Sequence, residues 1–197
     1  MIEIFGEQIT YIEIAGTVFG IAGVWLTIRQ NIFCFPAGII NVALYAYLFF
    51  KSKLYADAGL QIIYIALLVY GWMQWKEKTE DKKLQVTRSD NAALILFAII
   101  GIGATVLLGT FLYSKTDASL PYLDALTTVM SLIAQWLIAK KKIENWLIWI
   151  MADVIYVGMY IYKSLYLTSG LYFIFILLAV LGYMEWKKSL KQIPSNA

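Results

Sequence analysis

The sequence predicts an all-α integral membrane protein with seven transmembrane helices, built as two parallel three-helix repeats joined by a linker helix. Three observations support this fold class. Of the 197 residues, 61% are hydrophobic and only 15% are charged, and the mean hydropathy is +0.70, whereas roughly a quarter of the residues of a soluble domain are charged. Seven apolar segments are long enough to cross a bilayer, and the last three repeat the first three.

Each segment has the length of a membrane-spanning helix. About 20 apolar residues cross the roughly 30 Å of hydrocarbon, and lipid cannot satisfy a backbone that is neither helical nor part of a closed barrel. The runs are nearly continuous rather than alternating, which argues against barrel strands. We therefore predict helices over residues 9–28, 33–50, 55–75, 91–113, 119–139, 145–162 and 166–186.

Lysine and arginine are unequally divided between the two ends of these helices. Twelve lie in the loops 29–32, 76–90 and 140–144 or in the C-terminal tail, and four lie at the opposite ends. The positive-inside rule then places the C-terminus in the cytoplasm and the N-terminus outside. The chain does not begin with a charged segment, a short apolar core and a cleavage site, so we expect the first helix to be retained.

The chain also contains an internal repeat. A shift of 111 positions aligns residues 13–76 with residues 124–187 without a gap. In the last part of this overlap, 53–76 against 164–187, twelve of 24 positions are identical, far more than apolar composition alone would produce. One helix separates the two copies, so both must face the same way across the membrane.

We accordingly predict a single transmembrane domain over residues 1–197. It consists of a first three-helix repeat at 9–76, a linker helix at 91–113 and a second repeat at 119–187. Parallel repeats of this kind occur in transporters, whose substrate site lies near the midplane of the membrane between the halves.

One face of the sixth predicted helix combines aromatic rings with a single carboxylate. Asp153 lies about three helical turns from the nearest lysines, which places it in the middle of the bilayer, where an unpaired charge costs at least ~2.5 kcal/mol. Such residues usually mark a substrate path. The alternatives are that Trp146 is an interfacial anchor and that Asp153 only bonds neighbouring helices. The face comprises Trp146, Trp149, Asp153, Tyr156 and Tyr160.

Polar residues on other helices extend this predicted site. Asn41 lies at a similar depth on the second helix, Gln61 and Tyr64 share a face of the third, and Tyr172 is their counterpart on the seventh. Rings, amides and one carboxylate suit a flat, polar, cationic molecule, because cations are attracted to aromatic faces. The fifth helix has a stripe that serves either helix packing or the path, formed by Asp124, Thr127, Thr128, Ser131 and Gln135.

Composition excludes several classes of function. With one cysteine, Cys34, and no histidine, the chain has no means to form a disulfide framework, a Ser-His-Asp triad or a Cys/His metal site. We expect no metal and no cofactor. Nucleic acid is not an expected partner, because the basic residues report orientation rather than a binding patch. We find no nucleophile or metal cluster typical of a membrane enzyme, so we predict that the protein is not an enzyme. A membrane scaffold or sensor is the alternative of another class.

Three motifs resemble the PnuC family of bacterial vitamin transporters. They are LYAD at residues 54–57, YGWxxW at residues 70–75 and ENWxxW at residues 144–149, and the resemblance extends over nearly the whole chain. It implies a fold similar to that of the SWEET sugar transporters, with both three-helix repeats in one chain, and a location in the bacterial inner membrane.

The resemblance also implies a function. Family members import nicotinamide riboside, or thiamine in one branch, by facilitated diffusion with alternating access. A cytoplasmic kinase then traps the vitamin by phosphorylation, with no need to contact the transporter. By position, Trp146, Trp149, Asp153 and Gln61 would hold the substrate. Riboside transporters have asparagine where Asp153 stands, so the choice between the two cationic vitamins stays open. Lipid is the other expected partner, and a homo-oligomer is an open alternative.

Overall fold

The computed structural model describes residues 2–4, 7–51, 55–76 and 84–191. In this part of the chain, seven helices are long and apolar enough to cross a membrane. The predicted all-α membrane fold is confirmed. The helices are α1 (Tyr11–Ile28), α2 (Cys34–Lys51), α3 (Tyr55–Trp75), α4 (Asn91–Lys115), α5 (Pro121–Ala139), α6 (Glu144–Tyr162) and α7 (Tyr166–Lys191).

Apart from the end of α7, the helix ends lie within two residues of the predicted spans, and two features differ further. The helix α7 continues past residue 186 to Lys191, because a polar segment can extend a helix beyond the hydrocarbon. A short antiparallel hairpin, β1 (Ile2–Ile4) and β2 (Glu7–Ile9), precedes α1 and was not predicted. Its strands are too short to give a clear alternating pattern in the sequence.

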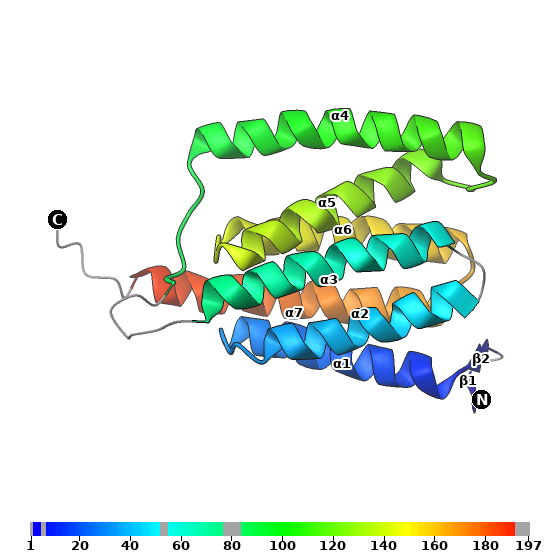
Figure 1. The fold of residues 1–197 in the computed structure, drawn as a ribbon, viewed down its shortest axis with the longest axis horizontal. Coiled ribbons are helices and arrows are strands. Elements are labelled where there is room, and N and C mark those ends of the chain that lie inside the picture. Colours follow the sequence, from blue (N-terminus) through cyan, green and yellow to red (C-terminus); the bar gives the residue numbers. More distant parts are fainter. Residues whose placement is uncertain (1, 5–6, 52–54, 77–83, 192–197) are drawn as a thin grey trace. The chain divides into compact units, whose positions relative to one another are not determined.

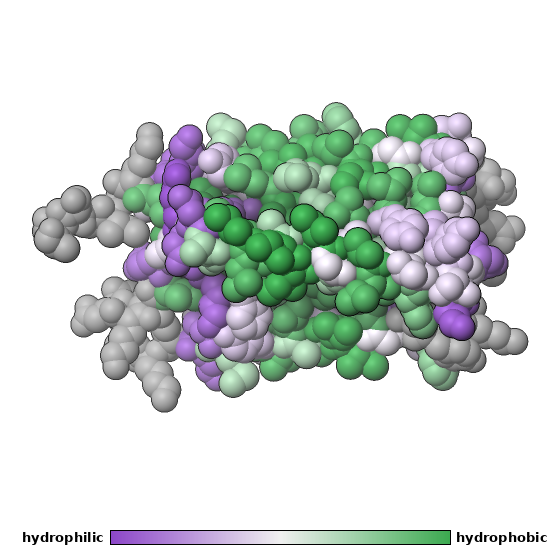
Figure 2. Space-filling model, turned by 90° about the horizontal axis from the view of Figure 1, so that it is seen from above, coloured by the Kyte–Doolittle hydropathy of each residue, from purple (hydrophilic) through white to green (hydrophobic). Residues whose placement is uncertain are grey.

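The chain divides into two compact units, residues 1–85 and 86–197. In the first unit α2 packs against α1 and α3, and in the second α5 packs against α4 and α6, while α6 also packs against α7 (Figure 1). In the face shown in Figure 2, hydrophobic side chains cover the middle of the helices and hydrophilic ones gather at their ends. This distribution matches a protein surrounded by lipid over the central part of its helices.

The turn after the first helix of each predicted repeat has the same geometry at positions 111 apart. Gln30 has a φ of 53° and Lys141 a φ of 49°. The N–H of Gln30 donates to Thr27 O and the N–H of Lys141 donates to Ile138 O, each at 2.9 Å. A left-handed residue with this hydrogen bond is the usual end of a helix in the Schellman motif. It redirects the chain into the next helix.

An edge-to-face aromatic pair also recurs at this offset. In the first unit the rings of Phe35 and Trp75 lie 5.0 Å apart at 89°, and in the second unit those of Trp146 and Trp186 lie 5.4 Å apart at 87°. Each pair connects the second and third helices of its repeat. The two units therefore use the same contact to pack these helices.

The segment 86–89, which precedes α4, is attached to the turn between α5 and α6. The N–H of Thr87 donates to Lys141 O and the C=O of Thr87 accepts from the N–H of Ile143, both at 3.0 Å. The side chain of Val86 is buried at the same place. Backbone pairing thus ties the segment before α4 to the turn between α5 and α6.

Candidate functional site in the second unit

The helix α6 holds Asp153 at its centre, nine residues from Glu144 and nine from Tyr162. Its side chain is buried, with 3% of the residue exposed. Within the described part of the second unit, no lysine or arginine lies within ion-pair distance of this carboxylate. A buried charge without a counter-ion is costly, so this position favours the binding of a cation.

Three tyrosines form an aromatic group beside Asp153, which we call the tyrosine stack: Tyr156 and Tyr160 of α6 and Tyr172 of α7. The centroid of the Tyr172 ring lies 4.6 Å from that of Tyr156 and 5.1 Å from that of Tyr160, and the two α6 rings lie 6.0 Å apart. The Asp153 carboxylate is within electrostatic range of Tyr156 and Tyr172. The stack therefore combines flat π faces with a nearby carboxyl group.

The helix α5 supplies hydroxyl groups to the same place. Thr127 and Ser131 are buried and lie close enough to the Tyr156 side chain to interact with it. Each also donates to its own helix: Thr127 Oγ1 to Leu123 O at 3.0 Å and to Asp124 O at 3.1 Å, and Ser131 Oγ to Thr127 O at 2.8 Å. Part of the α5 stripe therefore faces the tyrosine stack, which the sequence alone left undecided.

Trp146 is part of the helix packing at the other end of this face. Only 2% of the residue is exposed, its ring meets Trp186 edge to face, and a Cβ on Gly182 would come within 2.6 Å of the indole. The indole therefore packs between α6 and α7. The Nε1 atom is buried and has no hydrogen-bond partner among the described residues. Trp149 lies one turn further along α6 and is half-buried.

The remaining predicted site residues belong to the first unit. Asn41 Nδ2 donates to Gly16 O at 2.7 Å, which ties α2 to α1 and leaves the amide oxygen of Asn41 for another partner. Gln61 and Tyr64 are half-buried on α3. The structure thus brings Asp153, Tyr156 and Tyr172 together, whereas the roles of Asn41, Gln61 and Tyr64 in substrate binding stay predictions.

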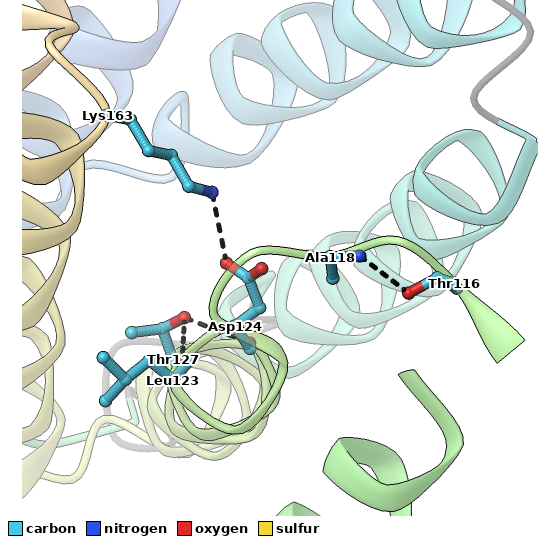
Figure 3. Close-up of polar contacts among 6 residues, drawn as sticks. All are labelled: Thr116, Ala118, Leu123, Asp124, Thr127 and Lys163. Atoms are coloured by element: carbon cyan, nitrogen blue, oxygen red, sulfur yellow. Dashed lines mark hydrogen bonds and ion pairs between the residues drawn. The ribbon is translucent and has the colours of Figure 1, made fainter. Parts of the chain in front are cut away.

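Two polar groups near the end of α6 were not among the predicted site residues. Figure 3 shows Lys163, just after α6, pointing toward Asp124 in the first turn of α5, and the distance from Lys163 Nζ to Asp124 Oδ1 is 3.9 Å. The sequence signal was the stripe that begins at Asp124, but it did not pair the two residues. For metal binding, the described residues contain no group of three or more His, Cys, Asp or Glu side chains that could hold an ion.

Comparison with known proteins identifies the family. The family model described as nicotinamide mononucleotide transporter matches residues 10–188. The chain belongs to this family. The resemblance to PnuC is confirmed as well, because the chain is 26% identical to the nicotinamide riboside transporter PnuC of Escherichia coli K12 over 98% of this chain and 91% of the relative.

Other relatives extend the comparison. The chain is 26% identical to the riboflavin/roseoflavin transporter RibM of Streptomyces davaonensis, over 93% of this chain and 87% of the relative. A crystal structure of the vitamin B3 transporter PnuC has the same fold, with a TM-score of 0.72 and 23% identity over 92% of this chain and 83% of that one. Since these relatives are transporters, the prediction of a multi-pass membrane transporter rather than an enzyme is confirmed.

Proposed function

We propose that this family member imports a small organic cation, with nicotinamide riboside as its substrate, by facilitated diffusion. The observation that carries the proposal is the position of Asp153. Its carboxylate is buried at the centre of α6, beside the tyrosine stack and without a lysine or arginine counter-ion in the described part of its unit. A positively charged ring would neutralise the carboxylate and stack on the tyrosines at once.

The physical chemistry favours a cation over an uncharged vitamin. A cation over an aromatic face gains ~0.5–2 kcal/mol, more as water is excluded, and charge-assisted hydrogen bonds are stronger than neutral ones. Nicotinamide riboside and thiamine both carry a cationic ring nitrogen, whereas riboflavin, which appears in the name of one relative, is uncharged. Thiamine is therefore the second candidate. The relatives named as riboside transporters favour nicotinamide riboside.

For the mechanism we propose that the two three-helix repeats rock about a site at the midplane and expose it to each side in turn. The turns at Gln30 and Lys141 and the edge-to-face pairs, both recurring 111 positions apart, support two equivalent halves. The charge distribution supports a cytoplasmic C-terminus. Phosphorylation of the vitamin by a cytoplasmic kinase then keeps the inward gradient.

Uptake into sealed vesicles tests this function. Purified protein is reconstituted, and labelled nicotinamide riboside, thiamine and riboflavin are offered in turn, with protein-free vesicles as the control. We expect saturable uptake of nicotinamide riboside, inhibited by an excess of unlabelled riboside, with the label chemically unchanged. Chemical conversion of the label would point to an enzyme. The absence of uptake of all three would favour a scaffold or sensor.

A further inference from the structure

An ion pair lies where α5 begins and α6 ends, away from the buried carboxylate. Lys163 Nζ is 3.9 Å from Asp124 Oδ1, and the two side chains are 31% and 33% exposed (Figure 3). The Lys188–Glu185 pair on α7 is much tighter, at 2.7 Å. A loose, partly exposed ion pair contributes ~0.2–1 kcal/mol or less. Lys163 can therefore be displaced from Asp124 at little energetic cost.

A line of polar groups leads from this pair to Asp153. Thr127 lies one turn after Asp124 on α5 and donates to the backbone C=O of Asp124. Thr127 and Ser131 both lie within interaction range of Tyr156 on α6. Tyr156 is within electrostatic range of both Asp124 and Asp153. The seven-residue step from Asp124 to Ser131 spans about 10 Å of helix. A partly exposed acid and a buried acid thus both lie within electrostatic range of the same aromatic ring.

We propose that Asp124 is a second cation-recognition residue of the transporter, at the entrance to the path, and that Lys163 occupies it until the substrate replaces the ammonium. The ligand is an organic monocation with a planar ring, so the inference rests on the proposed function. Asp124 recognises the positive charge of the substrate. It lies at the end of the helices that the lysine and arginine distribution assigns to the outside. The ring of Tyr156 is the next group that the substrate would contact. Lys163 thus competes with the substrate for the Asp124 carboxylate.

Opposite effects of two substitutions distinguish this role from that of a structural ion pair. Asp124→Asn removes the recognition charge and should raise the KM for nicotinamide riboside ~2- to 5-fold at low ionic strength, as expected for an interaction of this strength. Lys163→Met removes the competitor and should lower the KM by a similar factor. The double variant should behave like Asp124→Asn, because Lys163 acts only through Asp124. Lys163→Arg should keep the wild-type KM.

A matched control tests for a general effect of surface charge. Asp117 is exposed in the connection before α5, and Asp117→Asn should leave the KM unchanged. The melting temperature of each variant shows that it is folded. If Asp124→Asn and Lys163→Met change the KM in the same direction, or if Asp117→Asn matches Asp124→Asn, the entrance site is wrong while the transport function stands. If wild-type protein takes up neither nicotinamide riboside nor thiamine, the proposed function itself fails.

Discussion

The ring of Tyr172 on α7 lies 4.6 Å from that of Tyr156 on α6, which places the two helices in direct aromatic contact beside Asp153. If this contact forms the wall of the substrate site, Tyr172→Ala should raise the KM ~2- to 10-fold, since an aromatic contact contributes ~0.5–1.5 kcal/mol. Tyr172→Phe keeps the ring and should stay near the wild-type value in the vesicle assay.

The neighbouring Phe173 is exposed and provides the control for loss of a ring from α7. Phe173→Ala should leave the KM unchanged. A Tyr172→Phe variant as impaired as Tyr172→Ala would show that the hydroxyl, which interacts with Tyr160, matters rather than the π face.

Asp153 should determine binding of the cation. Asp153→Asn keeps the size and most of the hydrogen-bonding capacity but removes the charge, so we expect the KM for nicotinamide riboside to rise at least about tenfold, given ~1.5–3 kcal/mol for bonds to charged groups. Asp153→Ala should abolish uptake. Both variants should melt at or above the wild-type temperature, because a buried unpaired charge is removed. Full transport by Asp153→Ala would remove this residue from the site.

Uptake of a monovalent cation by uniport should depend on the membrane potential. An inside-negative potential of 100 mV supplies ~2.3 kcal/mol per charge and therefore about fifty-fold accumulation. A potassium diffusion potential set with valinomycin provides the measurement, and collapsing it should abolish accumulation above equilibrium. If Asp153 instead exchanged a proton for the cation, no net charge would cross. Uptake would then respond to a pH gradient and not to the potential.

Gly182 allows α7 to approach α6 at Trp146. A Cβ at this position would lie 2.6 Å from three atoms of the buried indole, so Gly182→Ala should lower stability by ~1–3 kcal/mol, as for an overpacked core. Gly103 on α4 has nothing within 4 Å of an added Cβ, and Gly103→Ala is the matched control. Its melting temperature should be unchanged or higher, because alanine is the better helix former. Equal melting temperatures for the two variants would show that α6 and α7 can separate without cost.

The sequence was sufficient for the membrane helices, because the length and composition of an apolar run are themselves the physical requirement for crossing lipid. The spacing of three and four along α6 also placed Asp153 and Tyr156 on one face correctly, since this face follows from the helix period alone. The end of α7 was less certain. Most of the residues after Trp186 in α7 are charged or polar, so the apolar pattern ends there. The lysines among them are still good helix formers, so the helix itself continues.

The packing environment of single side chains required the structure. Trp25 and Trp136 are exposed, whereas Trp146 and Trp186 are buried, although all four lie near helix ends where an aromatic belt is expected. The difference depends on the register between α6 and α7, which places Gly182 opposite Trp146. This register is set by the side chains of both helices, so the sequence pattern of one helix alone does not predict it. The Asp124–Lys163 pair likewise arises only when the start of α5 and the end of α6 are side by side.

The pairing of Thr87 with the turn at Lys141 has a consequence for how the protein could be divided. The segment before the fourth helix is hydrogen-bonded to the turn between the fifth and sixth helices, so a polypeptide starting at Val86 retains this contact. Fragments 1–85 and 86–197 each keep the backbone hydrogen bonds described for their helices. Two co-expressed genes divided at this point should therefore complement each other and restore vitamin uptake.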